Sequence, residues 1–158
     1  MKQQYKQKRE EGFTIIEVLI VLAIAALILV VVLVAIPQLQ RNQRNSARQN
    51  DASRVVTSVQ NWSANNNGRV FPGDSGSISS VANDLGDLAQ YDDLTTNLTH
   101  ATGVQSALTD LNQLRIVTRA TCGNDGVTVA GSGVGTRAVA VQFAVETAGD
   151  NEGRCVSS

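Results

Sequence analysis

Residues 8–17 read K-R-E-E-G-F-T-I-I-E, and an unbroken apolar run follows from Val18 to Ile36. At about 1.5 Å per residue, a helix from Phe13 to Ile36 is about 36 Å long, which is enough to cross a hydrocarbon core of ~30 Å. A secretory signal has a shorter apolar region of roughly 7 to 15 residues that ends at a small-residue cleavage site. The stretch therefore predicts a membrane-spanning helix rather than an ordinary signal peptide.

Charge on the two sides of this helix gives it only a weak orientation. The segment before it carries four basic residues against Glu10 and Glu11, and an excess of positive charge favours the cytoplasmic side. Arg41, Arg44 and Arg48 follow the apolar run on its other side and oppose this bias. The motif at the start of the helix therefore carries more weight than the charge distribution.

A charged segment that ends in Gly12, then Phe13, then Glu17 five residues after the glycine, resembles the leader junction of type IV prepilins and pseudopilins. The resemblance implies that a membrane prepilin peptidase cleaves after Gly12 and that the new amino terminus, Phe13, is N-methylated. It also implies an α+β pilin fold, in which one long N-terminal helix packs on a small antiparallel sheet.

Glu17 has two interpretations. Thr14 and Glu17 fit a T-x-x-E capping box, which closes the start of a helix with reciprocal hydrogen bonds. A carboxylate in an apolar span is costly and requires a partner. In the pilin family this glutamate pairs with the amino terminus of a neighbouring subunit, so here Phe13 and Glu17 would set the axial register of a filament.

Pro37 ends the apolar run but is not expected to end the helix. Proline removes one backbone donor and crowds the carbonyl of Leu33, which predicts a kink. The β-branched residues before it are weak helix formers. Similar pilins lose helical order just before such a proline in their filaments, so residues of about 27 to 37 are expected to extend on assembly. Many relatives have glycine where this chain has Ala26.

The rest of the helix is predicted from its spacing of apolar residues. Ala52, Val55, Val56, Val59 and Trp62 recur on one face, so the helix is expected to continue to about Asn66 and to pack its valines and Trp62 against a sheet. The chain then divides into a cleaved leader (1–12), a membrane and filament-core half of the helix (13–37), a helix half in the head (38–66), a variable loop region (67–113) and a sheet region (114–158).

The variable region contains two short helical patterns, and four aspartates that lack the ligand spacing of a calcium loop and are expected to be solvated. From Leu114 the period changes to two, which predicts one strand up to Cys122. A turn at 124–126, a short strand at 127–130, a flexible connection at 131–135, a strand at 136–146 and an edge strand at 152–156 are expected to follow. The two patterns are Val81, Leu85, Leu88 and Val104, Leu108, Leu111, and the aspartates are Asp84, Asp87, Asp92 and Asp93.

The sequence contains two cysteines, Cys122 and Cys155, in the part that would face an oxidising exterior. A disulfide between them is the preferred interpretation, and in pilins such a bond often fastens the C-terminal segment onto the sheet. The alternative of free or metal-binding thiols would need further Cys or His nearby, and the single histidine, His100, is isolated.

No catalytic constellation is found, so an enzyme is not expected, and neither is a cofactor or metal ion. Arg41, Arg44 and Arg48 form one stripe on the helix. They could be solvated, pair with acidic residues of neighbouring heads, or contact DNA phosphates, which is weakly supported because the net charge of the chain is −1. The sequons at Asn61 and Asn97 are not taken as modification sites.

The predicted function is that of a structural subunit of a type IV pilus that serves adhesion, twitching motility or DNA uptake. The subunit would be stored in the cytoplasmic membrane as a single-pass precursor, in contact with lipid, and then polymerised into an extracellular homo-oligomeric filament. Its expected partners are the prepilin peptidase, the pilus assembly machinery and minor pilins. The alternatives are a pseudopilin of a type II secretion system and a membrane-anchored binding module that keeps its leader.

Overall fold

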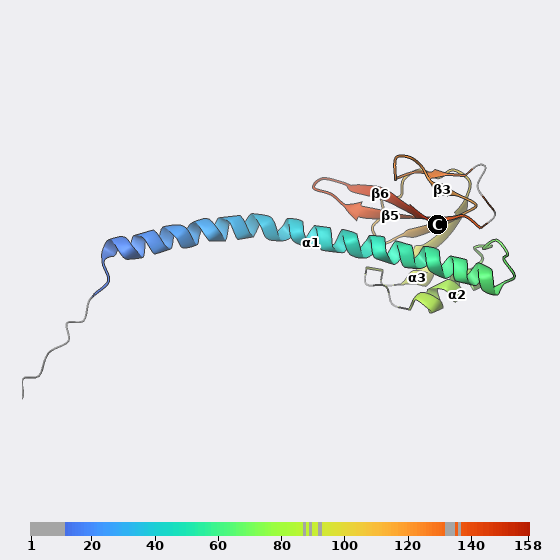
Figure 1. Ribbon diagram of the computed structural model, residues 1–158, viewed down its shortest axis with the longest axis horizontal. Helices are drawn as coiled ribbons and strands as arrows, with labels where there is room; N and C mark the ends of the chain where they lie inside the picture. The colour runs from blue at the N-terminus through green and yellow to red at the C-terminus, as the bar shows by residue number, and fades with distance from the viewer. Residues whose placement is uncertain (1–11, 87, 89, 92, 132–134, 136) are drawn as a thin grey trace, which may run out of the picture. The chain divides into compact units, whose positions relative to one another are not determined.

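The computed structural model describes residues 12–86, 88, 90, 91, 93–131, 135 and 137–158 (Figure 1). The chain forms two compact units, Met1–Leu39 and Gln40–Ser158, and we call the second unit the head. Helix α1 (Ile15–Asn65) contributes to both. Its bounds confirm the helix predicted between Phe13 and about Asn66, and it ends where Asn67 and Gly68 adopt positive φ values of 58° and 73°.

The head is an α+β structure built on a four-stranded sheet, which confirms the predicted fold class. The strand order is β1-β2-β5-β6, and a separate two-stranded sheet pairs β3 with β4. The elements of the head after α1 are α2 (Ser75–Leu85), α3 (Leu94–Asn97), β1 (Leu98–Thr102), β2 (Leu114–Thr118), β3 (Thr121–Cys122), β4 (Val129–Ala130), β5 (Val139–Glu146) and β6 (Asn151–Ser157).

One face of the four-stranded sheet forms the main core with α1 and α2. The bulky residues of β5 lie on this face, as their alternation predicted, and pack in one cluster with the valines of α1. Trp62 packs against the same cluster and meets Phe71 edge to face, with the ring centroids 5.2 Å apart. The members from α1 and β5 are Ala52, Val55, Val56, Val59, Val139, Val141, Phe143 and Val145.

The other face of the sheet carries small residues and is also buried. Ala140 of β5 packs with Val117 and Val129 under the small β3–β4 sheet. Gln142 is fully buried there, and its amide donates to the carbonyls of Ser106 and Val127 at 3.0 and 3.2 Å. The small side chains thus leave room for a second layer of chain, which a polar residue ties to the sheet.

The strand predicted from Leu114 to Cys122 is in fact two strands in two sheets. Arg119 breaks it with a φ of 57°, an uncommon conformation for a residue with a side chain. The break shifts the alternation by one, so Ala120 packs on the face of Val117 instead of the face of Leu114. The predicted strand at 127–130 is also shorter and consists of Val129 and Ala130.

Residues 103–113 do not form the helix that Val104, Leu108 and Leu111 suggested. Gly103, with a φ of 80°, ends β1, and the backbone of Gln105 then pairs with Val129 through both its N–H and its C=O. The segment passes so close to β6 that a Cβ at Gly153 would lie 3.0 Å from backbone atoms of Leu108. These long-range contacts hold the segment in an irregular, non-helical conformation against its local pattern.

Strand β1 was not predicted, and it makes the sheet mixed rather than wholly antiparallel. It pairs with β2 in parallel from Leu98↔Leu114 to Thr102↔Thr118. Its sequence, L-T-H-A-T, shows no clean alternation because little of the strand is covered: Leu98 is its one buried residue, and His100 and Ala101 are half-buried on opposite faces. The predicted edge strand around Cys155 is confirmed as β6, which pairs antiparallel with β5.

Candidate processing and assembly site

The predicted cleavage junction lies ahead of the first turn of α1. Gly12 and Phe13 are both exposed, with Phe13 90% exposed, and the helix begins two residues later at Ile15. A Cβ built on Gly12 would meet no atom of the chain within 4 Å. Among the described residues, nothing therefore requires glycine at position 12, so a requirement for glycine would come from an enzyme that binds the junction.

Glu17 and Thr14 form the capping box. Glu17 Oε2 accepts hydrogen bonds from the Thr14 backbone N–H at 2.8 Å and from the Thr14 hydroxyl at 2.7 Å, and the Glu17 N–H reaches the Thr14 hydroxyl oxygen at 3.3 Å. Both bonds to the carboxylate fall on one oxygen. Within the part of the chain that the structure describes, Glu17 Oε1 has no hydrogen-bond donor, so the capping box and a second, cationic partner are compatible.

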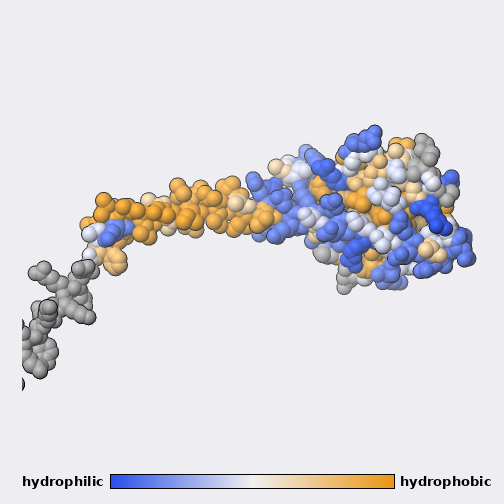
Figure 2. Space-filling model, in the orientation of Figure 1, coloured by the Kyte–Doolittle hydropathy of each residue, from blue (hydrophilic) through white to orange (hydrophobic). Residues whose placement is uncertain are grey.

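The part of α1 after Glu17 has an apolar surface that no described residue of the same chain covers. From Val18 to Leu39 the large apolar side chains are between 42% and 73% exposed, and Figure 2 shows this segment covered by apolar residues. Length and composition would allow this part of α1 to cross a membrane. The helix runs through Pro37, as predicted, although proline leaves the carbonyl four residues earlier without its usual donor.

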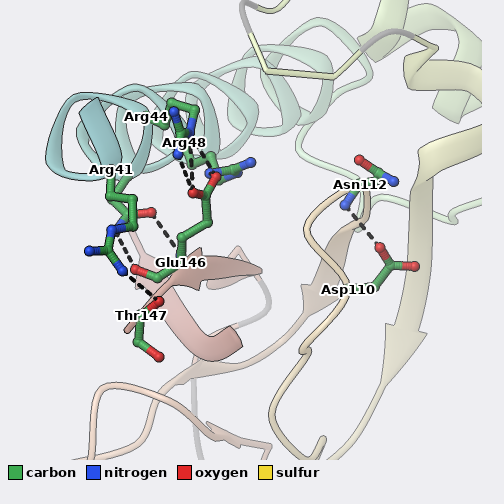
Figure 3. Close-up of polar contacts among 8 residues, drawn as sticks. Arg41, Arg44, Arg48, Asp110, Asn112, Glu146 and Thr147 are labelled. Atoms are coloured by element: carbon green, nitrogen blue, oxygen red, sulfur yellow. Dashed lines mark hydrogen bonds and ion pairs between the residues drawn. The ribbon is translucent and has the colours of Figure 1, made fainter. Parts of the chain in front are cut away.

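The first turns of α1 inside the head are fastened to the end of β5 by a group of polar contacts. We call these residues the clamp: Arg41, Arg44, Asn45 and Arg48 from α1 with Glu146 and Thr147 (Figure 3).

Asn45 of the clamp takes the place of a missing strand. Strand β2 pairs with β5 only as far as Gln142, so that side of β5 has no strand neighbour at Glu146. The Asn45 amide fills the position: its Nδ2 donates to the Glu146 carbonyl and its Oδ1 accepts from the Glu146 N–H, each at 2.8 Å. One side chain thereby satisfies two backbone groups that burial would otherwise leave unpaired.

The side chain of Glu146 binds two arginines of the clamp. Arg44 donates from Nε at 2.9 Å and from Nη2 at 2.5 Å, and Arg48 donates from Nη1 at 2.8 Å. Arg41 donates to the carbonyl of Thr147 at 3.3 Å. The hydrogen bonds from Arg44 and then Arg48 lower the pKa of Glu146 to about 2, so the carboxylate is ionised at any ordinary pH.

These contacts correct the interpretations of the arginine stripe. Arg48 is only 6% exposed, so a solvated face is wrong for this residue. Within the chain, the acidic partner of Arg44 and Arg48 is Glu146. Pairing of the arginines with acidic residues of neighbouring heads stays a prediction. Sequence reasoning missed Glu146 and Asn45, although a usable signal existed: Asn45 lies within the arginine stripe, and Glu146 closes a long apolar strand.

We expect Glu146→Gln to lower the free energy of unfolding of the head by about 2 to 3 kcal/mol. The substitution leaves the buried Arg48 without a charged partner, and the loss stays below that of a fully buried pair because the Glu146 side chain is 18% exposed. Arg44→Gln should cost clearly less than Glu146→Gln, since the Arg44 side chain is 42% exposed and solvent screens its charge. Urea unfolding of the two variants measures both, and equal losses would contradict this account.

The clamp also predicts an acid-sensitive head. The pKa of Glu146 lies below its ordinary value of 4.5, so the stabilisation is complete above about pH 4.5 and is lost as the pH falls toward 2. Burial raises the pKa of Asp51, which contributes with the opposite sign. Unfolding measured near pH 6 and near pH 3 should therefore show a smaller loss of stability in Glu146→Gln than in the unchanged chain. The same loss in both would rule out Glu146 as the sensitive group.

The two cysteines are joined. A Cys122–Cys155 disulfide links β3 to β6 across 33 positions of sequence, and it lies beside the small cluster formed by Val117, Ala120, Val129 and Ala140. It connects the two-stranded sheet to the edge of the larger one. The C-terminal strand is thus held both by its ladder with β5 and by a covalent bond.

We expect Cys122→Ser and Cys155→Ser each to lower the free energy of unfolding by roughly 3 to 4 kcal/mol, because either change opens the same loop. The double variant should lose little more than either single one, since both remove one bond. Thermal unfolding with and without a reductant provides the check, and the reductant should affect only the unchanged chain. A double variant that loses twice as much would show that packing, not the bond, is responsible.

The remaining candidates have structural roles. His100 lies against Phe71, with Nε2 3.1 Å from the Thr118 hydroxyl, and burial lowers the pKa of its imidazole. Asp84 and Asp93 are exposed, as expected for solvated aspartates; Asp84 also accepts from the Ser58 hydroxyl and Asp93 caps α3. Asp87, Asp92 and most of the 131–135 connection lie outside the described residues, as do residues 1–11 of the leader. Among the described residues, no group of His, Cys, Asp and Glu could hold a metal ion.

Comparison with known proteins gives one match. The family model described as the prokaryotic N-terminal methylation motif matches residues 7–33, which cover the charged segment, the Gly12–Phe13 junction, the capping box and most of the apolar run. Neither the curated proteins nor the solved structures give a significant match to the chain.

Proposed function

We propose that this chain, whose N-terminal methylation motif is typical of the type IV pilin and pseudopilin family, is the structural subunit of a type IV pilus. The precursor is stored in the cytoplasmic membrane, cleaved between Gly12 and Phe13 and methylated on Phe13. It is then polymerised into a surface filament that serves adhesion, twitching motility or DNA uptake. The protein is structural and not an enzyme.

The observation that carries this proposal is the uncovered apolar surface of Phe13–Leu39. A large apolar surface on a folded chain marks a membrane or protein contact. Lipid covers it in the stored subunit, and the same helices of other copies cover it in the filament. The same apolar surface can therefore contact lipid in the membrane and other subunits in a filament. The adjacent methylation motif supports movement of the subunit from the membrane into the filament.

The arrangement at Glu17 supports the order of events. In the stored precursor, the capping box supplies two donors to the carboxylate and lowers the cost of placing it near lipid. Cleavage then creates an amine at Phe13, and the unpartnered Oε1 of Glu17 can accept from the amine of a neighbouring subunit. Because this second partner exists only after cleavage, assembly depends on processing.

The nearest alternative is a pseudopilin of a type II secretion system, which has the same motif but forms a short periplasmic filament. The Cys122–Cys155 bond, which fastens the C-terminal strand as in many pilins, favours the pilus. A membrane-anchored binding module would keep residues 1–12, and its mass would reveal them.

Deleting the gene in the source organism tests the role. The deletion strain should lose surface filaments by electron microscopy and regain them when the unchanged chain is restored. It should also lose at least one of adhesion, twitching motility and DNA uptake. Filaments of normal number together with enzymes retained in the periplasm would instead identify a pseudopilin and overturn the pilus assignment.

A further inference from the structure

The clamp carries more positive charge than the head neutralises. Arg41, Arg44 and Arg48 face one carboxylate, Glu146, so the group has a surplus of two positive charges. Of the described acids near the clamp along the chain, Asp51 lies by Arg54 and Glu152 by Arg154, and Asp150 in the β5–β6 turn forms no ion pair with a clamp arginine. Within the described part of the head, no carboxylate forms an ion pair with Arg41.

The surplus lies on guanidinium groups that still have donors to offer. Arg41 uses only Nη1, in a 3.3 Å bond to a neutral carbonyl. Arg44 uses Nε and Nη2 on Glu146, and its Nη1 has no acceptor among the described residues. Both side chains are partly exposed, whereas Arg48 is buried. Arg41 and Arg44 are three positions apart, so they lie on one side of the helix.

The distance of Arg41 and Arg44 from the apolar run indicates their depth in the membrane of a stored subunit. Arg41 follows Ile36 by five residues, which is about 7.5 Å along an α-helix. The headgroup layer on each side of a bilayer is roughly 5 to 7 Å thick. Arg41 of a membrane-stored subunit is therefore level with the phosphates of the outer leaflet of the cytoplasmic membrane, and Arg44 is one helical turn farther out.

We propose that Arg41, assisted by Arg44, binds the phosphate of an anionic phospholipid in the outer leaflet while the subunit is stored in the membrane. Guanidinium groups match the geometry of phosphate oxygens and form charge-assisted hydrogen bonds with them. The contact also offsets the positive charge that these arginines place on the non-cytoplasmic side, against the usual bias. The inference rests on the proposed function, since it requires a membrane-stored subunit.

The test compares lipid retention by three forms of the full chain: unchanged, Arg41→Gln and Arg119→Gln. Each is placed in vesicles of phosphatidylcholine with a minority of phosphatidylglycerol, and native mass spectrometry counts the lipids that leave with the protein. We expect Arg41→Gln to retain about fivefold less phosphatidylglycerol, the effect of one arginine at an anionic surface. Arg41 is chosen because it makes no ion pair with the described residues of the head, so its loss should spare the fold.

Arg119→Gln is the matched control, because Arg119 is an exposed arginine on the β2–β3 connection, far along the chain from the apolar run. It should retain as much phosphatidylglycerol as the unchanged chain. Equal retention by all three forms would overturn the proposal, and so would displacement of the lipid by excess inorganic phosphate, which would indicate a site for soluble anions. Carbonate extraction of the same vesicles separates the two hypotheses: failed insertion refutes the membrane-stored subunit itself, whereas normal insertion with equal retention refutes only the lipid site.

Discussion

Gly12→Leu should leave almost all of the precursor uncleaved and should abolish surface filaments. The peptidase must accommodate the residue beside the cut, and a leucine side chain replaces a hydrogen there. The fold of the chain gives no competing reason for a defect, because a Cβ at position 12 meets nothing within 4 Å. Immunoblots of membrane fractions distinguish precursor from mature chain by size, and sheared fractions give the filament yield.

Two further variants show whether the defect belongs to the junction. Gly12→Ala adds only one methyl group and should be processed partially. Gly149→Leu alters an exposed glycine in the β5–β6 turn, where a Cβ also meets nothing, and should be processed normally. If Gly12→Leu yields mature subunits that begin at Phe13, the requirement for glycine beside the cut is wrong. If the mature subunits of the unchanged chain begin at another residue, the assigned cleavage point is wrong.

Glu17→Val should insert into the membrane normally and yet lower the filament yield at least tenfold. Valine suits the bilayer at least as well as a carboxylate, so insertion is spared. The variant removes the partner of the Phe13 amine, which then has no counter-ion in an apolar filament core. The amounts of subunit in membrane and sheared fractions separate the two steps.

The capping box makes this experiment sharper because its two halves can be changed separately. Glu17→Gln keeps an oxygen that can accept from Thr14 but removes the charge, whereas Thr14→Val removes the hydroxyl donor and keeps the carboxylate. If pairing with the amine governs assembly, Glu17→Gln should fail and Thr14→Val should still form filaments. If the capping box alone matters, each variant should cost only ~0.5 to 2 kcal/mol of local helix stability and leave filaments near normal.

The parts of the fold that were predicted from sequence are those with strong local signals. The unbroken apolar run predicts a helix that is apolar on all sides, and the spacing of Val55, Val59 and Trp62 predicts one apolar face; α1 contains both and ends at Asn65. The alternation in β5 was equally clear, because bulky residues cover α1 while small ones lie beneath a second layer of chain.

The errors arose where long-range contacts override local pattern. Residues 103–113 look helical, but pairing of Gln105 with Val129 and the close approach at Gly153 hold them in an irregular, non-helical conformation. Strand β1 has no periodic signal because it is an edge strand with little burial. At the candidate site, the motif at Gly12, Phe13 and Glu17 could be recognised from the sequence. Glu146 could not, because it lies about a hundred residues from the arginines it binds and only the fold brings them together.

The most direct test of the central claim is mass spectrometry of filaments sheared from the cell surface. We predict a subunit that begins at Phe13, carries one methyl group on its amino terminus and is two hydrogens lighter than the reduced chain because Cys122 and Cys155 are joined. Fragmentation would locate the methyl group, and reduction would restore the two hydrogens. Filaments whose subunits still begin at Met1, or a chain found only in membranes with residues 1–12 intact, would contradict the account.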